Sequence, residues 1–180
     1  MNIHKLKPVV PYLGIPVLGL ALWLIHGPEY DAYTLLAYEL LIGFGYAAAL
    51  SDLRSKRIPN EYIVAMLAAW VMIMVPQLFV NTESALSSLK NAIAGFGLGG
   101  ILFLLVYLIS RKGLGGGDVK LMAAFGLYLG FSNVLPAMLY GSVLSALTAL
   151  VLVLLKRIGR KDAIPLAPFL YIGVLLAIFL

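Results

Sequence analysis

The sequence contains no cysteine, and this absence excludes several kinds of chemistry at once. Disulfides, thiol nucleophiles and cysteine-ligated zinc all require that residue. Histidine is almost as scarce: the two histidines, His4 and His26, fall on opposite faces of a membrane in the topology derived below. A histidine metal site or a Ser–His catalytic pair is therefore not expected, and we predict neither a metal nor a cofactor.

Charge is also in short supply. Only 12% of the 180 residues are charged, while 62% are hydrophobic and the mean hydropathy is +1.01. A spanning helix needs about 20 apolar residues, so little chain would remain for a soluble domain. This composition predicts an all-α, polytopic membrane protein whose surroundings are the lipid bilayer. The net charge of +5 is better explained by cytoplasmic loops than by a nucleic-acid partner, because Lys and Arg mark such loops.

Apolar runs separated by polar or turn residues predict about seven spans. Their approximate ranges are 9–25, 32–51, 62–80, 91–110, 119–131, 134–155 and 163–180. We treat the first run as a retained span and not as a signal peptide, since no small-x-small cleavage pattern lies near Ile25. We expect a single integral membrane domain over residues 1–180, with 1–31 as an extra N-terminal span and 32–180 as the catalytic core.

The basic residues are distributed very unevenly between the two sides of this arrangement. When ends and loops are assigned alternately, twelve of the thirteen basic residues fall on the side of the N-terminus, and only Lys90 falls on the other. This bias predicts a cytoplasmic N-terminus in a multi-pass protein of the cytoplasmic (inner) membrane. It also places Asp52 and Asp118, which are 66 residues apart, on the same cytoplasmic side.

The fifth apolar run is too short for an ordinary span. Residues 118–131 would form a helix of about 21 Å, whereas the hydrocarbon core is about 30 Å thick. We expect Ser132 and Asn133 to break the run. Either the bilayer thins here, or the start of the helix lies below the membrane surface, with the preceding glycine loop dipping inward. The second arrangement would partly bury Asp118, and it requires protein or water around the irregular backbone.

Two acids follow or end apolar runs and are the candidate catalytic residues. Asp118 comes directly after the glycines Gly115–Gly117, whose lack of side chains allows close approach of a bound peptide. The alternative role for Asp118 is that of an N-cap. The alternative for Asp52 is a solvated loop acid neutralised by Arg54 or Arg57. An ionisable group at membrane depth is nevertheless a functional hypothesis by default.

Brought into one pocket, two carboxyl groups share a proton, because both cannot easily ionise together. The ionised partner can then activate a water while the protonated partner polarises a carbonyl, which is the chemistry of aspartic proteases. Glu39 lies about 20 Å from Asp52 along a helix and is expected near the outer face. The G-x-G-x-x-G match at residues 95–100 lies within an apolar run, where helix packing explains it better than dinucleotide binding, and the glycines of 126–130 are interpreted in the same way.

Three segments resemble the signatures of type IV prepilin peptidases, and they follow one another along the chain in the same order as in that family. Residues 115–121 (GGGDVKL) resemble the GxGD-x-K signature. Residues 52–54 (DLR) with 58–60 (IPN) resemble the segment of the first aspartate, and residues 164–169 (IPLAPF) resemble the late Ile-Pro-x-x-Pro-Phe element.

The resemblance implies a membrane aspartyl endopeptidase that removes the basic leader from prepilins or related pseudopilins. Asp52 and Asp118 match the catalytic pair. The residues expected to bind substrate or shape the loops are Gly115, Gly116, Gly117, Lys120, Arg54, Pro59 and Asn60.

Other branches of the family fit less well. The larger members carry a cytoplasmic segment with cysteine pairs that can bind zinc, and they also methylate the new N-terminus. This cysteine-free chain resembles the minimal form of tight-adherence (Flp) pilus systems, so methyltransferase activity is not predicted. Ser51 precedes Asp52, where presenilin-like proteases carry tyrosine. The alternatives left open are an ion- or proton-binding transport or structural protein, and an archaeal preflagellin-type peptidase.

Overall fold

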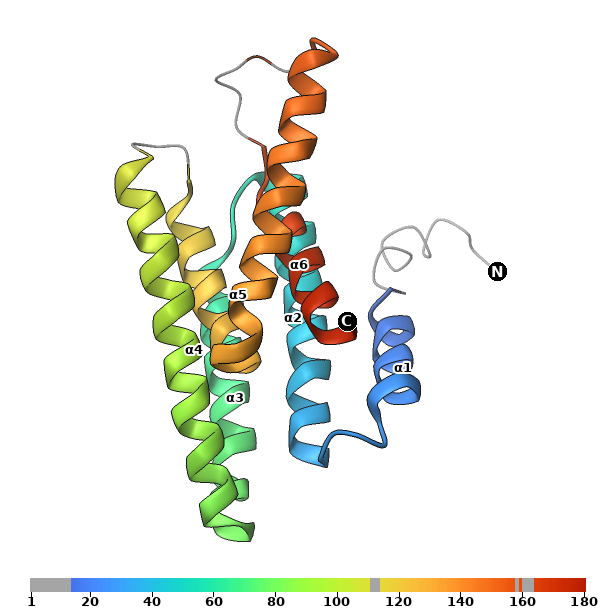
Figure 1. Ribbon diagram of the computed structural model, residues 1–180, viewed down its shortest axis with the longest axis vertical. Helices are drawn as coiled ribbons and strands as arrows, with labels where there is room; N and C mark the ends of the chain where they lie inside the picture. Colours follow the sequence, from blue (N-terminus) through green and yellow to red (C-terminus); the bar gives the residue numbers. More distant parts are fainter. Residues whose placement is uncertain (1–13, 111–113, 158, 160–163) are drawn as a thin grey trace.

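The computed structural model describes residues 14–110, 114–157, 159 and 164–180, and all regular structure in these ranges is helical (Figure 1). The helices are α1 (Gly14–His26), α2 (Ala32–Ser55), α3 (Asn60–Val80), α4 (Thr82–Ile109), α5 (Gly116–Leu154) and α6 (Ala167–Phe179). In this part of the chain, α2 to α5 are each long and apolar enough to cross a membrane, and α1 and α6 are shorter apolar helices. The prediction of an all-α, multi-pass membrane protein is confirmed, while the count of seven spans and the cytoplasmic N-terminus stay predictions.

The helix α5 reverses direction at Gly130 (Figure 1). This glycine has φ +71° and ψ −178°, a backbone conformation that is essentially restricted to glycine. Two contacts of Gly99 agree with the reversal: a Cβ on Gly99 would lie 2.7 Å from the carbonyl oxygen of Met122 and 3.2 Å from the Val134 side chain. In a straight helix those two partners would be about 18 Å apart. We therefore describe α5 as a first arm (residues 116–129) and a second arm (residues 131–154).

The expected break at Ser132 and Asn133 is wrong, because the chain turns at Gly130. The side chain of Asn91 in α4 stabilises the turn, since its Oδ1 accepts a hydrogen bond of 3.0 Å from the backbone N–H of Phe131. A side chain at position 130 would collide with the same Asn91 amide. Only glycine both adopts this backbone conformation and leaves room for the Asn91 amide. The turn is therefore at position 130, and Ser132 comes after it.

Close glycine contacts join the first arm of α5 to α4. A Cβ on Gly95 would overlap the backbone of Gly126, and a Cβ on Gly126 would overlap the backbone of Gly95. Helices that approach this closely gain extensive van der Waals contact in a membrane. The prediction that residues 95–100 and 126–130 serve helix packing is confirmed. Gly141 and Gly173 make the corresponding contact between the second arm and α6.

The first arm forms the centre of the bundle, since every residue from Leu121 to Gly130 is buried. The end of α2, the start of α3, the end of α4 and the start of α5 lie toward one end of the bundle, which we call the aspartate face (Figure 1). Residues 27–31 and Asn81 lie at the other end, which we call the opposite face. The predicted alternation of the polar connections between two ends is thus present.

Several predicted element boundaries are wrong. Asp52 was expected in a loop, but α2 continues to Ser55. The expected polar connection of residues 81–88 is reduced to Asn81, whose Oδ1 accepts a hydrogen bond of 3.1 Å from the N–H of Ser84 and so caps α4. The glycine loop is shorter than expected because α5 already begins at Gly116. The residues of the first predicted span that precede position 14 lie outside the described ranges.

Candidate active site

Asp52 lies in the last turn of α2 and is buried, with 6% of its surface exposed. Its Oδ2 accepts a hydrogen bond of 3.0 Å from the backbone N–H of Ala167, the first residue of α6. The backbone of Leu166 contributes a further hydrogen bond. The N-terminus of a helix carries unpaired N–H groups and a partial positive charge, so it stabilises a carboxylate. The alternative of a solvated loop acid is wrong for Asp52.

Asp118 lies in the first turn of α5 and is also buried, with 9% of its surface exposed. Its Oδ2 accepts a hydrogen bond of 3.1 Å from the backbone N–H of Gly115, which precedes the helix. The alternative of an N-cap is wrong for Asp118: Gly115 is the N-cap of α5, and Asp118 stands at the third helical position, from which its side chain bonds back to the N-cap backbone. Its Oδ1 is buried without a partner among the described residues. A buried polar atom of this kind is uncommon and requires an explanation, and an oxygen free to bond a water or a substrate proton is one.

The fold brings the two carboxyl groups into one region at the aspartate face. The charge of Asp52 acts directly on Asp118, although 66 residues separate them in the sequence. One side chain comes from the end of α2 and the other from the start of α5. The structure thus brings the two candidate catalytic residues together from the ends of two long helices.

Lys120 and Asn60, which were both expected to bind substrate or shape the loops, contact each other. The Nζ of Lys120 donates a hydrogen bond of 3.1 Å to Oδ1 of Asn60. This contact joins the start of α5, two residues beyond Asp118, to the start of α3. Lys120 and Asn60 thus link two segments that border the site.

The glycines of the loop have different surroundings. A Cβ on Gly115 would lie 2.9 Å from Oδ2 of Asp118, and one on Gly117 would lie 3.3 Å from the Ile58 side chain. A Cβ on Gly116 would meet nothing within 4 Å. Position 115 is thus restricted by the carboxyl group it holds, position 117 packs on the α2–α3 connection, and position 116 leaves open space.

The remaining predicted site residues are less closely tied to the acids. Pro59 is partly buried at the N-cap of α3. Arg54 is exposed, and no ion pair to either acid is found for it within the described ranges. Glu39 is exposed on the far side of α2 among apolar residues of α1 and α2. No group of three or more His, Cys, Asp or Glu side chains that could hold a metal comes together in the part of the chain that the structure describes.

One part of the site was missed by the sequence-based assignment. Ala167 and Leu166 hold Asp52 through backbone groups, and both lie in the Ile-Pro-x-x-Pro-Phe segment, which was noted without a role. The available signal was the pair of prolines, Pro165 and Pro168, since proline favours the first positions of a helix. A helix that starts there directs its free N–H groups toward the aspartate face.

Fold and site together define a polytopic helical membrane protein built around a buried pair of aspartates. The sequence profile of the type IV leader peptidase family matches residues 39–150, a range that includes both acids. The chain belongs to this family.

Its curated relatives include proteins named prepilin leader peptidase/N-methyltransferase. The chain is 32% identical to the one from Bacillus subtilis (strain 168) over 130 residues, which are 72% of this chain and 49% of the relative. It is 34% identical to the one from Legionella pneumophila, over 82% of this chain and 49% of the relative. With the one from Pectobacterium carotovorum subsp. carotovorum the identity is 30%, over 94% of this chain and 58% of the relative.

The chain therefore spans about half the length of these relatives. No solved structure matches the chain.

Proposed function

We propose that this protein is a membrane aspartyl endopeptidase that removes the basic leader from type IV prepilins or related pseudopilins. The observation that carries the proposal is the meeting of Asp52 and Asp118, both buried and electrostatically coupled, at the ends of two long apolar helices. Membership of the leader peptidase family and the names of the relatives support the substrate class.

The chemistry follows from the state of the two carboxyl groups. A pair that shares one proton offers a carboxylate and a carboxylic acid side by side. The carboxylate takes a proton from water as the water oxygen attacks the scissile carbonyl carbon. The carboxylic acid gives its proton to the carbonyl oxygen, and the tetrahedral intermediate then collapses as a proton passes to the departing amine. The unpartnered Oδ1 of Asp118 and the carboxyl group of Asp52, oriented by the Ala167 N–H at its Oδ2, are the groups available for these transfers.

The leader would reach the site from the aqueous side. We place the aspartate face in the cytoplasm of a multi-pass protein of the cytoplasmic membrane, because the alternation predicted from the sequence assigns twelve of the thirteen basic residues to the side of Asp52 and Asp118. The open space at Gly116 lets an extended peptide backbone pass close to the acids. The Lys120–Asn60 hydrogen bond shapes the rim over which the peptide lies.

Co-expression with a prepilin that carries a basic leader tests the proposal through the mobility shift of the cleaved product. We expect Asp52→Asn and Asp118→Asn each to reduce cleavage at least about 100-fold, because each removes one half of the proton transfer. Both variants should remain in the membrane fraction, since asparagine has the same shape.

Asp31→Asn is the matched control. Asp31 caps α2 at the opposite face through the N–H of Thr34, 2.9 Å away, and asparagine is an equally good cap. This variant should cleave normally. Normal cleavage by both Asp52→Asn and Asp118→Asn would show that the pair is not catalytic, and a transport or ion-binding role would then have to be considered.

A further inference from the structure

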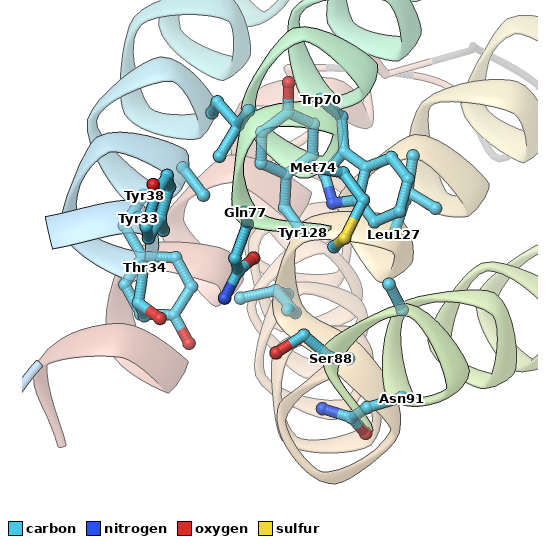
Figure 2. Close-up of a pocket in the computed structure, with 15 residues that line it drawn as sticks. Tyr33, Thr34, Tyr38, Trp70, Met74, Gln77, Ser88, Asn91, Leu127 and Tyr128 are labelled. Carbon is cyan, nitrogen blue, oxygen red and sulfur yellow. The ribbon is translucent and has the colours of Figure 1, made fainter. Parts of the chain in front are cut away.

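A polar cavity of about 130 Å³ lies at the end of the first arm of α5 that carries the Gly130 turn, whereas Asp118 is at the start of the same arm (Figure 2). Its wall is formed by α2, α3 and α4 together with the end of the first arm of α5. None of its lining residues carries a formal charge. The residues among them with polar side-chain atoms are Tyr33, Thr34, Tyr38, Trp70, Gln77, Ser88, Asn91 and Tyr128.

Gln77 is the clearest sign that the cavity is occupied by something that forms hydrogen bonds. Its side chain is buried, with 6% of the residue exposed, and its amide points into the cavity (Figure 2). No hydrogen-bond partner for this amide is found among the described residues. The amide atoms are not among the fully enclosed polar atoms that lack a partner, so they are open to the cavity, where a small polar molecule such as water can bond them.

The reversal of α5 creates the cavity. The first arm is a helix of about 21 Å and ends against α4 at the level of Asn91 and Gly95, as the contacts of Gly130 show. Between this level and the opposite face, the first arm no longer fills the space between α2, α3 and α4. The N–H of Phe131, which would bond the Leu127 carbonyl in an uninterrupted helix, donates to Asn91. Asn91, which also lines the cavity, thus takes part in forming the turn.

The cavity lies close to the opposite face. Thr34 is in the first turn of α2, Gln77 is in the last turn of α3, and Ser88 is in the second turn of α4. These three helix ends all meet the opposite face (Figure 1). The volume of about 130 Å³ is well above the roughly 10–15 Å³ that one water needs by the same measure, so several water molecules fit in the cavity.

We propose that this cavity is a water-filled vestibule that opens to the opposite face and hydrates the end of the first arm. The occupant is uncharged because no lining side chain balances an ion. The vestibule explains how a helix shorter than the hydrocarbon core fits the membrane: its C-terminal end meets water held inside the protein. This inference is independent of the peptidase activity.

The absence of native cysteine allows a direct test with single-cysteine variants and a small, charged, membrane-impermeant thiosulfonate. Gln77→Cys is compared with Val75→Cys on the same helix. Val75 is 45% exposed on the surface of the bundle and would face lipid, where a thiol neither ionises nor meets the reagent. We expect Gln77→Cys to react at least tenfold faster, so that the residue buried in the protein is labelled and the residue exposed on its surface is not.

Ser88→Cys, a nearly isosteric change, gives a second measurement if Gln77→Cys disturbs folding. Its matched control is Ile93→Cys, which is 58% exposed on the outside of α4. Both cavity variants should react in sealed vesicles only when the reagent is on the side of the opposite face. Equal slow labelling of the cavity and control variants would overturn the proposal. Slowing by more than threefold when choline is replaced by Na⁺ would identify a bound cation in place of water, and would overturn it as well.

Discussion

Each of the two acids is held by a backbone amide from a segment other than its own helix. Asp52 accepts from Ala167, far away in the sequence, whereas Asp118 accepts from Gly115 just before its own helix. Hydrogen bonds of this kind to charged groups are short and comparatively strong. They fix one oxygen of each carboxyl group and leave the rest of the pair for chemistry.

The acids themselves were predictable from the sequence, because ionisable side chains beside long apolar runs are conspicuous. The amide of Ala167 was not predictable as a ligand of Asp52, since every residue except proline carries the same N–H group. Lys120 and Asn60 were predicted as site residues, but their mutual contact depends on the packing of α3 against α5 and has no local signature.

Gly116→Ala should separate substrate binding from stability. Its Cβ would meet nothing within 4 Å, and alanine is favoured over glycine in a helix, so thermal stability in detergent should be unchanged or higher. The added methyl group would project where we place the peptide, so KM should rise by about tenfold, equivalent to about 1.4 kcal/mol. An unchanged KM would show that the peptide does not bind against position 116.

Lys120 and Asn60 should affect catalysis together, through the hydrogen bond that joins them. We expect Lys120→Met and Asn60→Ala each to lower kcat/KM by roughly 2- to 12-fold, corresponding to about 0.5–1.5 kcal/mol for one hydrogen bond. The double variant should be no worse than the more damaging single variant. Lys90→Met, at an exposed position in α4, is the control. Fully additive losses would indicate that the two residues act separately.

Among the helices, the contact between α4 and the first arm of α5 is the most restrictive. The general positions of both helices were predictable from hydropathy, but their ends were not, because polar residues continue inside α2 and α4. Asp52 is stabilised in the helix by α6, and residues 82–88 are accommodated because Asn81 caps the helix. The turn at Gly130 was missed because its backbone conformation depends on Asn91 of a neighbouring helix.

Two glycines of α4, Gly95 and Gly97, offer a matched comparison of this contact. A Cβ on Gly95 would overlap the backbone of Gly126, whereas one on Gly97 would meet nothing within 4 Å. Gly95→Ala should therefore lose about 1–3 kcal/mol of stability through overpacking. Gly97→Ala should be neutral or gain up to about 1 kcal/mol through helix propensity. Thermal unfolding in detergent measures both, and equal behaviour would contradict the close packing of α4 on α5.

The bundle as assembled has its polar connections at two ends, and the charge bias of the sequence predicts which end is cytoplasmic. Hydropathy and charge together predicted this alternation, because both are summed over many residues and tolerate errors in any single boundary. The depth of each helix could not be obtained in this way, since it depends on contacts such as that of Gly95 with Gly126.

Single cysteines at Arg57 and Glu83 should report the orientation. Both residues are exposed, one in the α2–α3 connection and the other in the first turn of α4. We expect an impermeant thiol reagent added outside intact cells to label Glu83→Cys and not Arg57→Cys. Permeabilised cells, in which both should react, provide the control. Labelling of Arg57→Cys in intact cells would reverse the predicted orientation.

The burial of every residue from Leu121 to Gly130 has a consequence for the cell that carries the protein. Along this stretch the helix that bears Asp118 is covered on all sides by protein, so a change in the membrane lipids does not act on that helix directly. A change in lipid length or fluidity can affect Asp118 only by first moving the helices that surround the first arm.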